Sequence, residues 1–231
     1  MIDISEASTI VLNQRLTLGE ERVPLEQAIG RVLREDLRAE RDFPPFDRVT
    51  MDGIAIQHQA FAGGQRKFPI QGTQAAGAPQ MTLEHSEHCM EVMTGAMLPV
   101  DCDTVIRYED IQIQEGVAEL QVDQIKAQQN VHHRGTDRKA QDLIVAAGGI
   151  ISSAEIGVAA TIGKNTLLVA RRPKVVIITT GDELVEVDQQ PLPHQIRSSN
   201  VYKIKSALHQ WNLEADRLHL VDDLPTIEKH L

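Results

Sequence analysis

The hundred residues from about 43 to 142 constrain the fold most, because glycine and proline interrupt them throughout. Between the interruptions lie short β-prone runs at residues 89–93, 104–108 and 117–122. Short runs of this kind, bounded by turn formers, are typical of strands in a β-rich domain. The interrupting residues are Gly72, Gly77, Pro79, Gly95, Pro99 and Gly116. We therefore predict a β-rich insert in the middle of the chain.

The last third of the sequence has a different pattern. Residues 174–180 form a continuous β-branched run, which favours a strand covered on both faces. A helix is predicted from about Asn200, as N-cap, to Trp211, and residues 218–221 are predicted as the next parallel strand. Val201, Ile204, Leu208 and Trp211 recur at helical spacing. This order indicates one β-loop-α-β unit of an α/β domain.

Three further helices are expected. Ser5 is a candidate cap for a helix running to about Gln14, with one buried face. A second short helix is expected near residues 25–33, after a proline that suits a first turn. Ser152 and Glu155 have the spacing of a capping box, so a third helix should follow them. The face expected to be buried in the first helix carries Ala7, Ile10 and Val11.

Composition excludes several functions. The formal charge is −10 and aromatic residues make up 3%, which argues against a nucleic-acid-binding face. No apolar run approaches the length of a membrane span, and the N-terminus lacks the pattern of a signal peptide, so we expect a cytoplasmic protein. Cys89 and Cys102 are too few for a disulfide framework and are expected to be reduced structural thiols.

Two parallel strands do not bury both faces of a doubly wound sheet. The sequence therefore leads us to expect either a piece of a longer protein or a partner that completes the sheet.

Acidic residues on four loops are the main candidates for chemistry. Asp52 ends a rigid loop that contains Pro44, Pro45 and Asp47, and Asp137 lies in a second loop. The third and fourth sites, Asp182-Glu183 and Asp222-Asp223, follow the two predicted parallel strands. Ligands bind at the carboxyl ends of such strands, so Asp182, Glu183 and Asp223 are expected to share a crevice suited to Mg²⁺. For any single aspartate, the alternative is a turn or capping role.

Polar groups on three other loops are candidate anion contacts. Thr94 stands beside a glycine and offers a hydroxyl and a backbone N–H. Ser198-Ser199-Asn200 precedes a helix, whose first N–H groups suit a phosphate, although N-capping explains the triplet equally well. His132-His133 lies beside Arg134 and Arg138, and we interpret it as a solvated basic loop.

The ordered motifs resemble those of the molybdopterin molybdenumtransferase family, which includes MoeA and the gephyrin E-domain. The resemblance spans essentially the whole chain and rests on five motifs in order. They are Pro44-Pro45-Phe46-Asp47 with Met51-Asp52-Gly53-Ile54-Ala55, Met93-Thr94-Gly95-Ala96 with Leu98-Pro99, Asn130-Val131 with Arg134-Gly135-Thr136-Asp137, Arg172-Pro173, and Thr180-Gly181-Asp182-Glu183-Leu184.

The resemblance implies a multidomain protein of α/β and β class. Residues 20–39 and 141–168 would form a discontinuous small domain, and residues 40–140 the β-rich insert. Residues 1–19 and 169–231 would form an incomplete α/β, molybdopterin-binding-like domain. Family members also have a C-terminal β-barrel, which this sequence would lack, and they form elongated homodimers.

The resemblance also assigns roles to individual residues. Asp52, Asp137 and Glu183 would be catalytic, and Asp182, Glu183 and Asp223 would bind Mg²⁺. Asp52 or Asp137 would reach the acids after the strand from the other subunit. The substrate-binding residues would be Thr94, Gly181, Asp182, Ser199 and Asn200. Thr136 departs from the family pattern, because a glutamate is usual there and its charge is lost.

The implied reaction is the Mg²⁺-dependent insertion of molybdate into adenylylated molybdopterin, with release of AMP. Two alternatives remain open, a molybdopterin adenylyltransferase and a non-enzymatic gephyrin-like scaffold. The long β insert argues against the first, since that enzyme class resembles the α/β domain alone. A molybdopterin adenylyltransferase is also a possible partner. The sequence does not decide between molybdate and tungstate.

Overall fold

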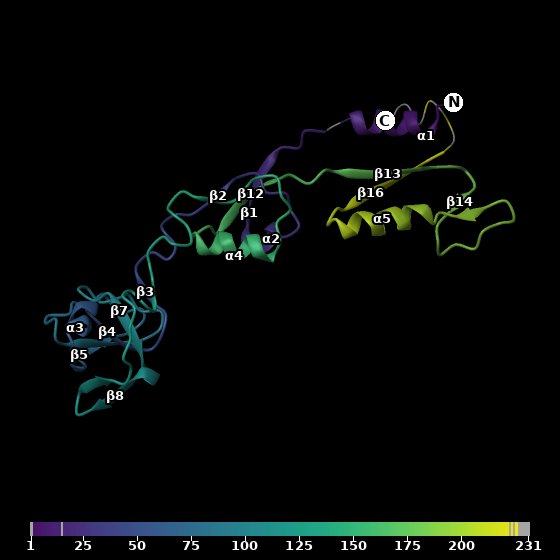
Figure 1. Cartoon of the computed structure of the whole chain (residues 1–231). Coiled ribbons are helices and arrows are strands. Elements are labelled where there is room, and N and C mark those ends of the chain that lie inside the picture. Colours follow the sequence, from purple (N-terminus) through teal and green to yellow (C-terminus); the bar gives the residue numbers. More distant parts are fainter. Residues whose placement is uncertain (1, 15, 222, 224, 226–231) are drawn as a thin grey trace. The chain divides into compact units, whose positions relative to one another are not determined.

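A computed structural model of the chain describes residues 2–14, 16–221, 223 and 225. The chain divides into two compact units, which are described separately below (Figure 1). The first unit contains residues 1–36 and 145–231, and the second contains residues 37–144. The structure is mixed α/β and rich in sheet. The three-part division given above stays a prediction.

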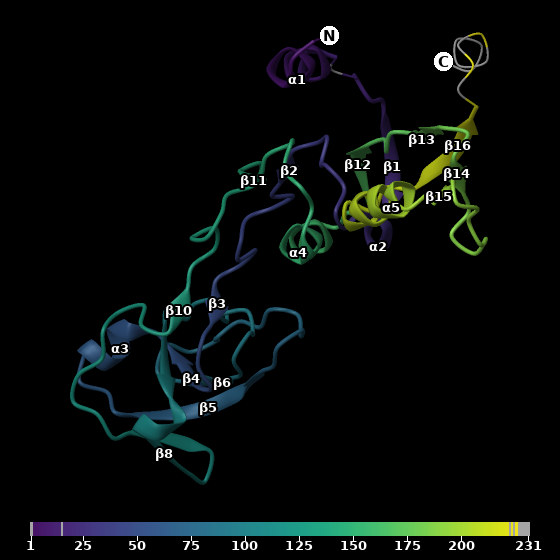
Figure 2. The same cartoon turned by 90° about the vertical axis from the view of Figure 1, so that its right-hand side faces the viewer.

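A six-stranded sheet forms the core of the second unit, and its strand order is β7-β4-β6-β5-β9-β8. Figure 2 labels β4, β5, β6 and β8 of this sheet. All neighbouring pairs are antiparallel except β5 and β6, which are parallel. The strands are β4 (Gly53–Ile56), β5 (Lys67–Gln74), β6 (Cys89–Val92), β7 (Thr104–Arg107), β8 (Ile111–Gln114) and β9 (Val117–Leu120). The β-prone runs at 89–93, 104–108 and 117–122 are thereby confirmed as β6, β7 and β9.

The strands of this sheet alternate their side chains between two apolar clusters. Ile54 and Ile56 of β4 pack into one cluster with Phe68 and Ile106, whereas Ala55 packs into the other. This period of two is what a strand with apolar contacts on both faces requires. Cys89 and Cys102 lie one in each cluster as free, buried thiols, which confirms their structural role.

Short elements complete the second unit. Strand β3 (Arg48–Val49) pairs with β10 (Val131–His132) in antiparallel register, and β2 (Leu37–Arg38) pairs with β11 (Leu143–Val145). The helices are α3 (His58–Ala62) and the 3-10 helix η1 (Tyr108–Asp110). The pairing of β3 with β10 joins two loops that are about eighty residues apart in sequence, because Arg48 is opposite His132.

The first unit contains an antiparallel pair and two helices. Strand β1 (Glu20–Pro24) pairs with β12 (Thr166–Ala170), and they accompany α2 (Leu25–Ala28) and α4 (Ser153–Thr161). The predicted capping box is confirmed: Ser152 Oγ accepts from the Ala154 N–H at 3.1 Å, and Glu155 accepts from the Ser152 N–H at 2.7 Å.

The α/β part of the first unit consists of a parallel pair with one helix. Strand β13 (Val175–Thr180) pairs in parallel with β16 (Ala215–Leu220), and α5 (Asn200–Gln210) connects them with β14 (Leu184–Val185) and β15 (Ile196–Arg197). The predicted β-loop-α-β unit is confirmed. The expectation that β13 is covered on both faces is wrong for the described residues, because Val176 is 52% exposed and Ile178 is 37% exposed.

Three helix predictions need correction. The cap of α1 (Ile4–Asn13) is Asp3 and not Ser5, since the Asp3 carboxylate accepts from the Glu6 N–H at 2.8 Å. No residue of α1 is buried, so the expected apolar face is exposed. The helix expected at 25–33 ends at Ala28, because the chain turns at Gly30 and then forms extended bridges.

The start of α5 also differs from the prediction. Its N-cap is Ser199 rather than Asn200, and no side-chain cap bond forms there. Val201 is buried, but Ile204 and Trp211 are 45% and 69% exposed, so only part of the expected apolar face is covered. None of the helices in the part of the chain that the structure describes is long and apolar enough to cross a membrane.

Candidate functional site

Asp52 and Thr94, which are 42 residues apart in sequence, meet in the second unit. The backbone N–H of Thr94 donates to Asp52 Oδ1 at 2.6 Å. Backbone pairing holds the two loops together, since the Gly95 N–H donates to the Val49 carbonyl at 2.9 Å and the Val49 N–H donates to the Ala96 carbonyl at 3.0 Å. Both Asp52 and Thr94 are exposed to solvent. The structure therefore brings two of the predicted site residues into direct contact.

The Asp52 carboxylate is tuned by this contact. Hydrogen bonds from the Thr94 backbone and then from its side chain lower the pKa of Asp52 below its usual value, against a small opposing effect of burial. A carboxylate with a lowered pKa stays ionised at neutral pH and serves as an acceptor or as a ligand to a hard cation. The bond to Thr94 also uses one acceptor position of Asp52, so the carboxylate is oriented as well as charged.

Asp137 lies in a loop that is tied to residues 43–48 of the same unit. Its N–H donates to the Phe43 carbonyl at 2.9 Å, and His132 Nε2 lies 3.0 Å from Asp137 Oδ1. Arg48 Nη2 lies 3.2 Å from His132 Nδ1. Because a guanidinium only donates, Nδ1 accepts, and Nε2 carries the proton that is donated to Asp137. His132, which the sequence indicated only as part of a solvated loop, therefore orients a predicted catalytic carboxylate.

The adjoining loop residues form a second set of bonds. Asp47 Oδ1 accepts from the Arg134 N–H at 2.8 Å, and the Arg134 guanidinium donates to Asp42 at 2.8 Å. His133 Nδ1 lies 3.5 Å from Asp47 Oδ1. Each of these basic groups has an acidic neighbour, so the loop is a mixed-charge network and not a purely basic patch.

In the first unit, a cleft of about 290 Å³ lies beside the carboxyl end of β13. Strand residues 177–180 and the turn into α5 line it, including Ser198, Ser199 and Asn200. Ser198 is buried, whereas Ser199 and Asn200 are exposed. The predicted substrate-binding residues Ser199 and Asn200 therefore border a cleft at the strand end where ligands of α/β sheets bind.

Asp182 and Glu183 lie on the turn that follows β13, and both are exposed. Gly181 has a positive φ of 125°, and a Cβ atom there would lie 2.7 Å from Glu183 Oε2. The positive φ favours glycine at this position, and the Glu183 carboxylate folds back over it. Two adjacent carboxylates on an exposed turn provide the oxygen donors that Mg²⁺ prefers, so the donor chemistry fits this ion.

The structure does not assemble the whole predicted metal set. Among residues 2–14, 16–221, 223 and 225, no group of three or more His, Cys, Asp or Glu side chains converges as metal ligands. Asp223 follows β16, where its N–H donates to the Val221 carbonyl at 2.7 Å. Asp222 lies outside the described residues. Ligation of Mg²⁺ by Asp182, Glu183 and Asp223 thus stays a prediction.

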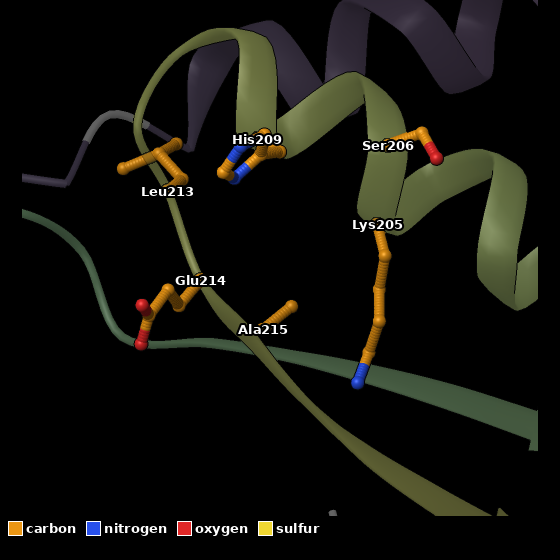
Figure 3. Close-up of a pocket in the computed structure, with 6 residues that line it drawn as sticks. All are labelled: Lys205, Ser206, His209, Leu213, Glu214 and Ala215. Atoms are coloured by element: carbon orange, nitrogen blue, oxygen red, sulfur yellow. The ribbon is translucent and has the colours of Figure 1, made fainter.

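A larger cleft of about 540 Å³ lies between the second half of α5 and the start of β16. Figure 3 shows Lys205 and His209 projecting from the helix over this space, with Leu213 and Glu214 at its edge. None of the predicted site residues lines it. Its volume alone does not make it a functional site, because the residues with assigned roles lie elsewhere.

The chain resembles known proteins along its length. Residues 2–163 match the model of the MoeA N-terminal region, domains I and II. A molybdopterin molybdenumtransferase of Synechocystis sp. is 37% identical over 236 residues, which cover 100% of this chain and 60% of that protein. One from Staphylococcus epidermidis is 30% identical over 218 residues, covering 92% of this chain and 52% of that protein.

A solved structure is also similar. The molybdopterin biosynthesis MoeA protein of Pyrococcus horikoshii superposes with a TM-score of 0.85 at 27% identity, covering 99% of this chain and 59% of that one. The chain therefore spans about half to three fifths of the length of these relatives.

Proposed function

The chain belongs to the family of the MoeA N-terminal region, and from this membership we propose that it forms part of a molybdopterin molybdenumtransferase. The reaction would be the insertion of molybdate into adenylylated molybdopterin, with release of AMP. The observation that carries the proposal is the contact between Asp52 and Thr94, since both match motifs by which the family is recognised. Two motif residues that are distant in sequence and share one short hydrogen bond support a common site.

The proposed roles fall on residues of both units. Asp52, oriented by Thr94, and Asp137, oriented by His132, supply carboxylates from the β-rich unit. Asp182 and Glu183 would hold Mg²⁺ together with Asp223, and Thr94, Gly181, Ser199 and Asn200 would bind the anionic substrate. The bound ion would neutralise charge on the phosphate link that is cleaved. This charge balance explains how a chain with a formal charge of −10 accepts an anionic pterin phosphate.

The assembly that we propose is a cytoplasmic homodimer in which Asp52 or Asp137 of one subunit acts with Glu183 of the other. The domain division would follow the family, with the discontinuous small domain, the β-rich insert and the α/β domain at the boundaries predicted above. A molybdopterin adenylyltransferase is the expected partner that supplies the adenylylated substrate.

The decisive experiment replaces Glu183 by Gln in the protein that carries this chain. Glu183→Gln should abolish Mg²⁺-dependent molybdate insertion and leave the thermal midpoint of unfolding unchanged, because the side chain is exposed. Asp188→Asn, which changes another exposed acid in the same region, is the matched control and should keep activity. Retained activity of Glu183→Gln would reject the assignment.

A second measurement separates an enzyme from a scaffold. If the protein is an enzyme, adenylylated molybdopterin and Mg²⁺ together should raise the thermal midpoint more than either does alone. A scaffold would show no such response.

A further inference from the structure

The backbone of Gly53, the residue after Asp52, lies between two neighbouring strands. Gly53, the first residue of β4, is opposite Arg107 of β7 on one side and Val92 of β6 on the other. The Tyr108 N–H donates to the Asp52 carbonyl at 3.1 Å. A Cβ atom at Gly53 would lie 1.9 Å from the Ile106 carbonyl oxygen. Strand β7 therefore lies so close to this position that only glycine fits there.

A tyrosine and a glutamate connect the strands on either side of β4. The Tyr108 hydroxyl donates to Glu91 Oε1 at 2.7 Å, and the Thr73 hydroxyl donates to Glu91 Oε2 at 3.0 Å. Glu91 lies on β6, where it is opposite Ile54 of β4 and beside Thr73 of β5. Opposed residues share one face of a sheet, so this bond extends from the end of β7 to β6 across β4.

Tyr108 thereby bonds the Asp52 main chain directly and, through Glu91, the strand that leads to Thr94. Its backbone holds the Asp52 main chain, and its side chain holds the strand that leads, three residues after Glu91, to Thr94. Burial, followed by the hydrogen bond to Glu91 and then by the charge of Glu91, raises the pKa of Tyr108 to about 12. The phenol therefore remains a protonated donor at neutral pH, and its bond to a carboxylate is charge-assisted.

We propose that Tyr108 and Glu91 are positioning residues, which keep the Asp52 carboxylate on the Thr94 N–H. The geometry rests on hydrogen bonds within the second unit, and its catalytic meaning rests on the proposed function. Neither residue needs to touch the substrate. Their effect is to fix the distance between β6 and β7, and with it the orientation of the carboxylate.

The first test observes Thr94 directly in the 231-residue chain. In Tyr108→Phe, the Thr94 amide proton should shift upfield and exchange faster with solvent, because its bond to Asp52 loosens. Glu91→Leu, which removes the acceptor, should have the same effect and decides the question if Tyr108→Phe does not fold. Thr73→Val is the matched control: it removes the other bond to Glu91 and should leave the Thr94 amide unchanged.

The positioning role is overturned if the Thr94 amide is unchanged in a folded Tyr108→Phe or Glu91→Leu variant. It is also overturned if Thr73→Val shifts this amide as much as Tyr108→Phe does, since the effect would then be a general loosening of the sheet.

The second test measures molybdate insertion by the whole protein that carries this chain. Tyr108→Phe should lower kcat by on the order of tenfold to a hundredfold with little change in KM, as expected when a catalytic group is misplaced. Thr73→Val should keep kcat. Absence of insertion in the wild-type protein, with the expected Thr94 shifts, refutes the proposed function and supports the positioning role. Normal wild-type insertion with no Thr94 shift in either variant refutes the positioning role alone.

Discussion

Gly53→Ala is the substitution whose effect the structure determines most directly. The added Cβ atom would lie 1.9 Å from the Ile106 carbonyl oxygen, and real Cβ atoms essentially never come within 3.0 Å of such an atom. Strands β4 and β7 must therefore separate locally by the difference, about 1.1 Å. Ladder hydrogen bonds have a length of about 2.9 Å, so a separation of this size breaks those around the Gly53 and Arg107 pair.

The expected cost follows from these lost bonds. A backbone hydrogen bond contributes about 1 kcal/mol net, and a buried backbone group left without a partner costs about 1 to 3 kcal/mol. With the donor and the acceptor of one ladder position affected, Gly53→Ala should destabilise the second unit by on the order of 3 to 5 kcal/mol. Native domains have a stability of only about 5 to 15 kcal/mol, so this loss is large.

Urea unfolding followed by circular dichroism gives the change in free energy, and amide hydrogen exchange of β4 and β7 locates it. Gly116→Ala is the matched control in the same unit. Gly116 has a φ of +77° and nothing within 4 Å of an added Cβ atom, so only backbone strain of about 1 to 2 kcal/mol is expected. If both variants lose the same stability, the close approach at Gly53 is not the cause and the reasoning is refuted.

Other measurements test separate parts of the fold. Ser152→Ala should destabilise the first unit by about 1 kcal/mol in thermal unfolding, because the N-cap bond of α4 is lost, whereas Ser152→Thr should retain most of it. Burial alone would raise the pKa of Glu35. The hydrogen bonds that Glu35 accepts, first from Lys164 and then from the Leu168 N–H, outweigh burial and lower the pKa below 4.5. The resulting stability is present above pH 4.5 and lost as the pH falls through the lowered pKa. If the free energy of unfolding of Glu35→Gln falls with acid as that of the wild type does, this assignment is contradicted. Burial raises the pKa of Cys89 and Cys102 to about 12, so both should resist alkylation at pH 8 until the chain unfolds, and rapid labelling of the native protein would contradict their burial.

Local signals in the sequence predicted much of the fold. The turn-bounded β-prone runs became β6, β7 and β9, and the capping box at Ser152 began α4 where expected. The failures came where a competing contact decided the outcome. Asp3 provides a stronger acceptor than Ser5 at the start of α1, and extended bridges after Gly30 end α2 early. Such contacts depend on partners that a local pattern does not specify.

The uninterrupted apolar run of β13 illustrates a second limit. A run without alternation indicates that both faces of a strand suit apolar surroundings. It does not say which element covers each face. In the described residues only Ile177 of this strand is buried, and Val176 and Ile178 remain exposed. Strand type, direction and partner were therefore predictable here, but coverage was not.

Asp52 shows why a list of motif residues falls short of a site. The resemblance named Asp52 and Thr94 separately and directed attention to acids of another subunit. The structure gives Asp52 a partner within its own unit, through a hydrogen bond that joins two loops 42 residues apart.

The position of Asp52 depends in turn on Gly53, which allows β7 to lie close by, and on Tyr108. Tyr108 belongs to none of the five motifs. The Thr94 bond lowers the pKa of Asp52, so a tertiary contact favours the ionised form of a carboxylate that the motif itself only supplies. A homologous chain that keeps the Met-Asp-Gly motif but loses the tyrosine should therefore hold its aspartate less firmly.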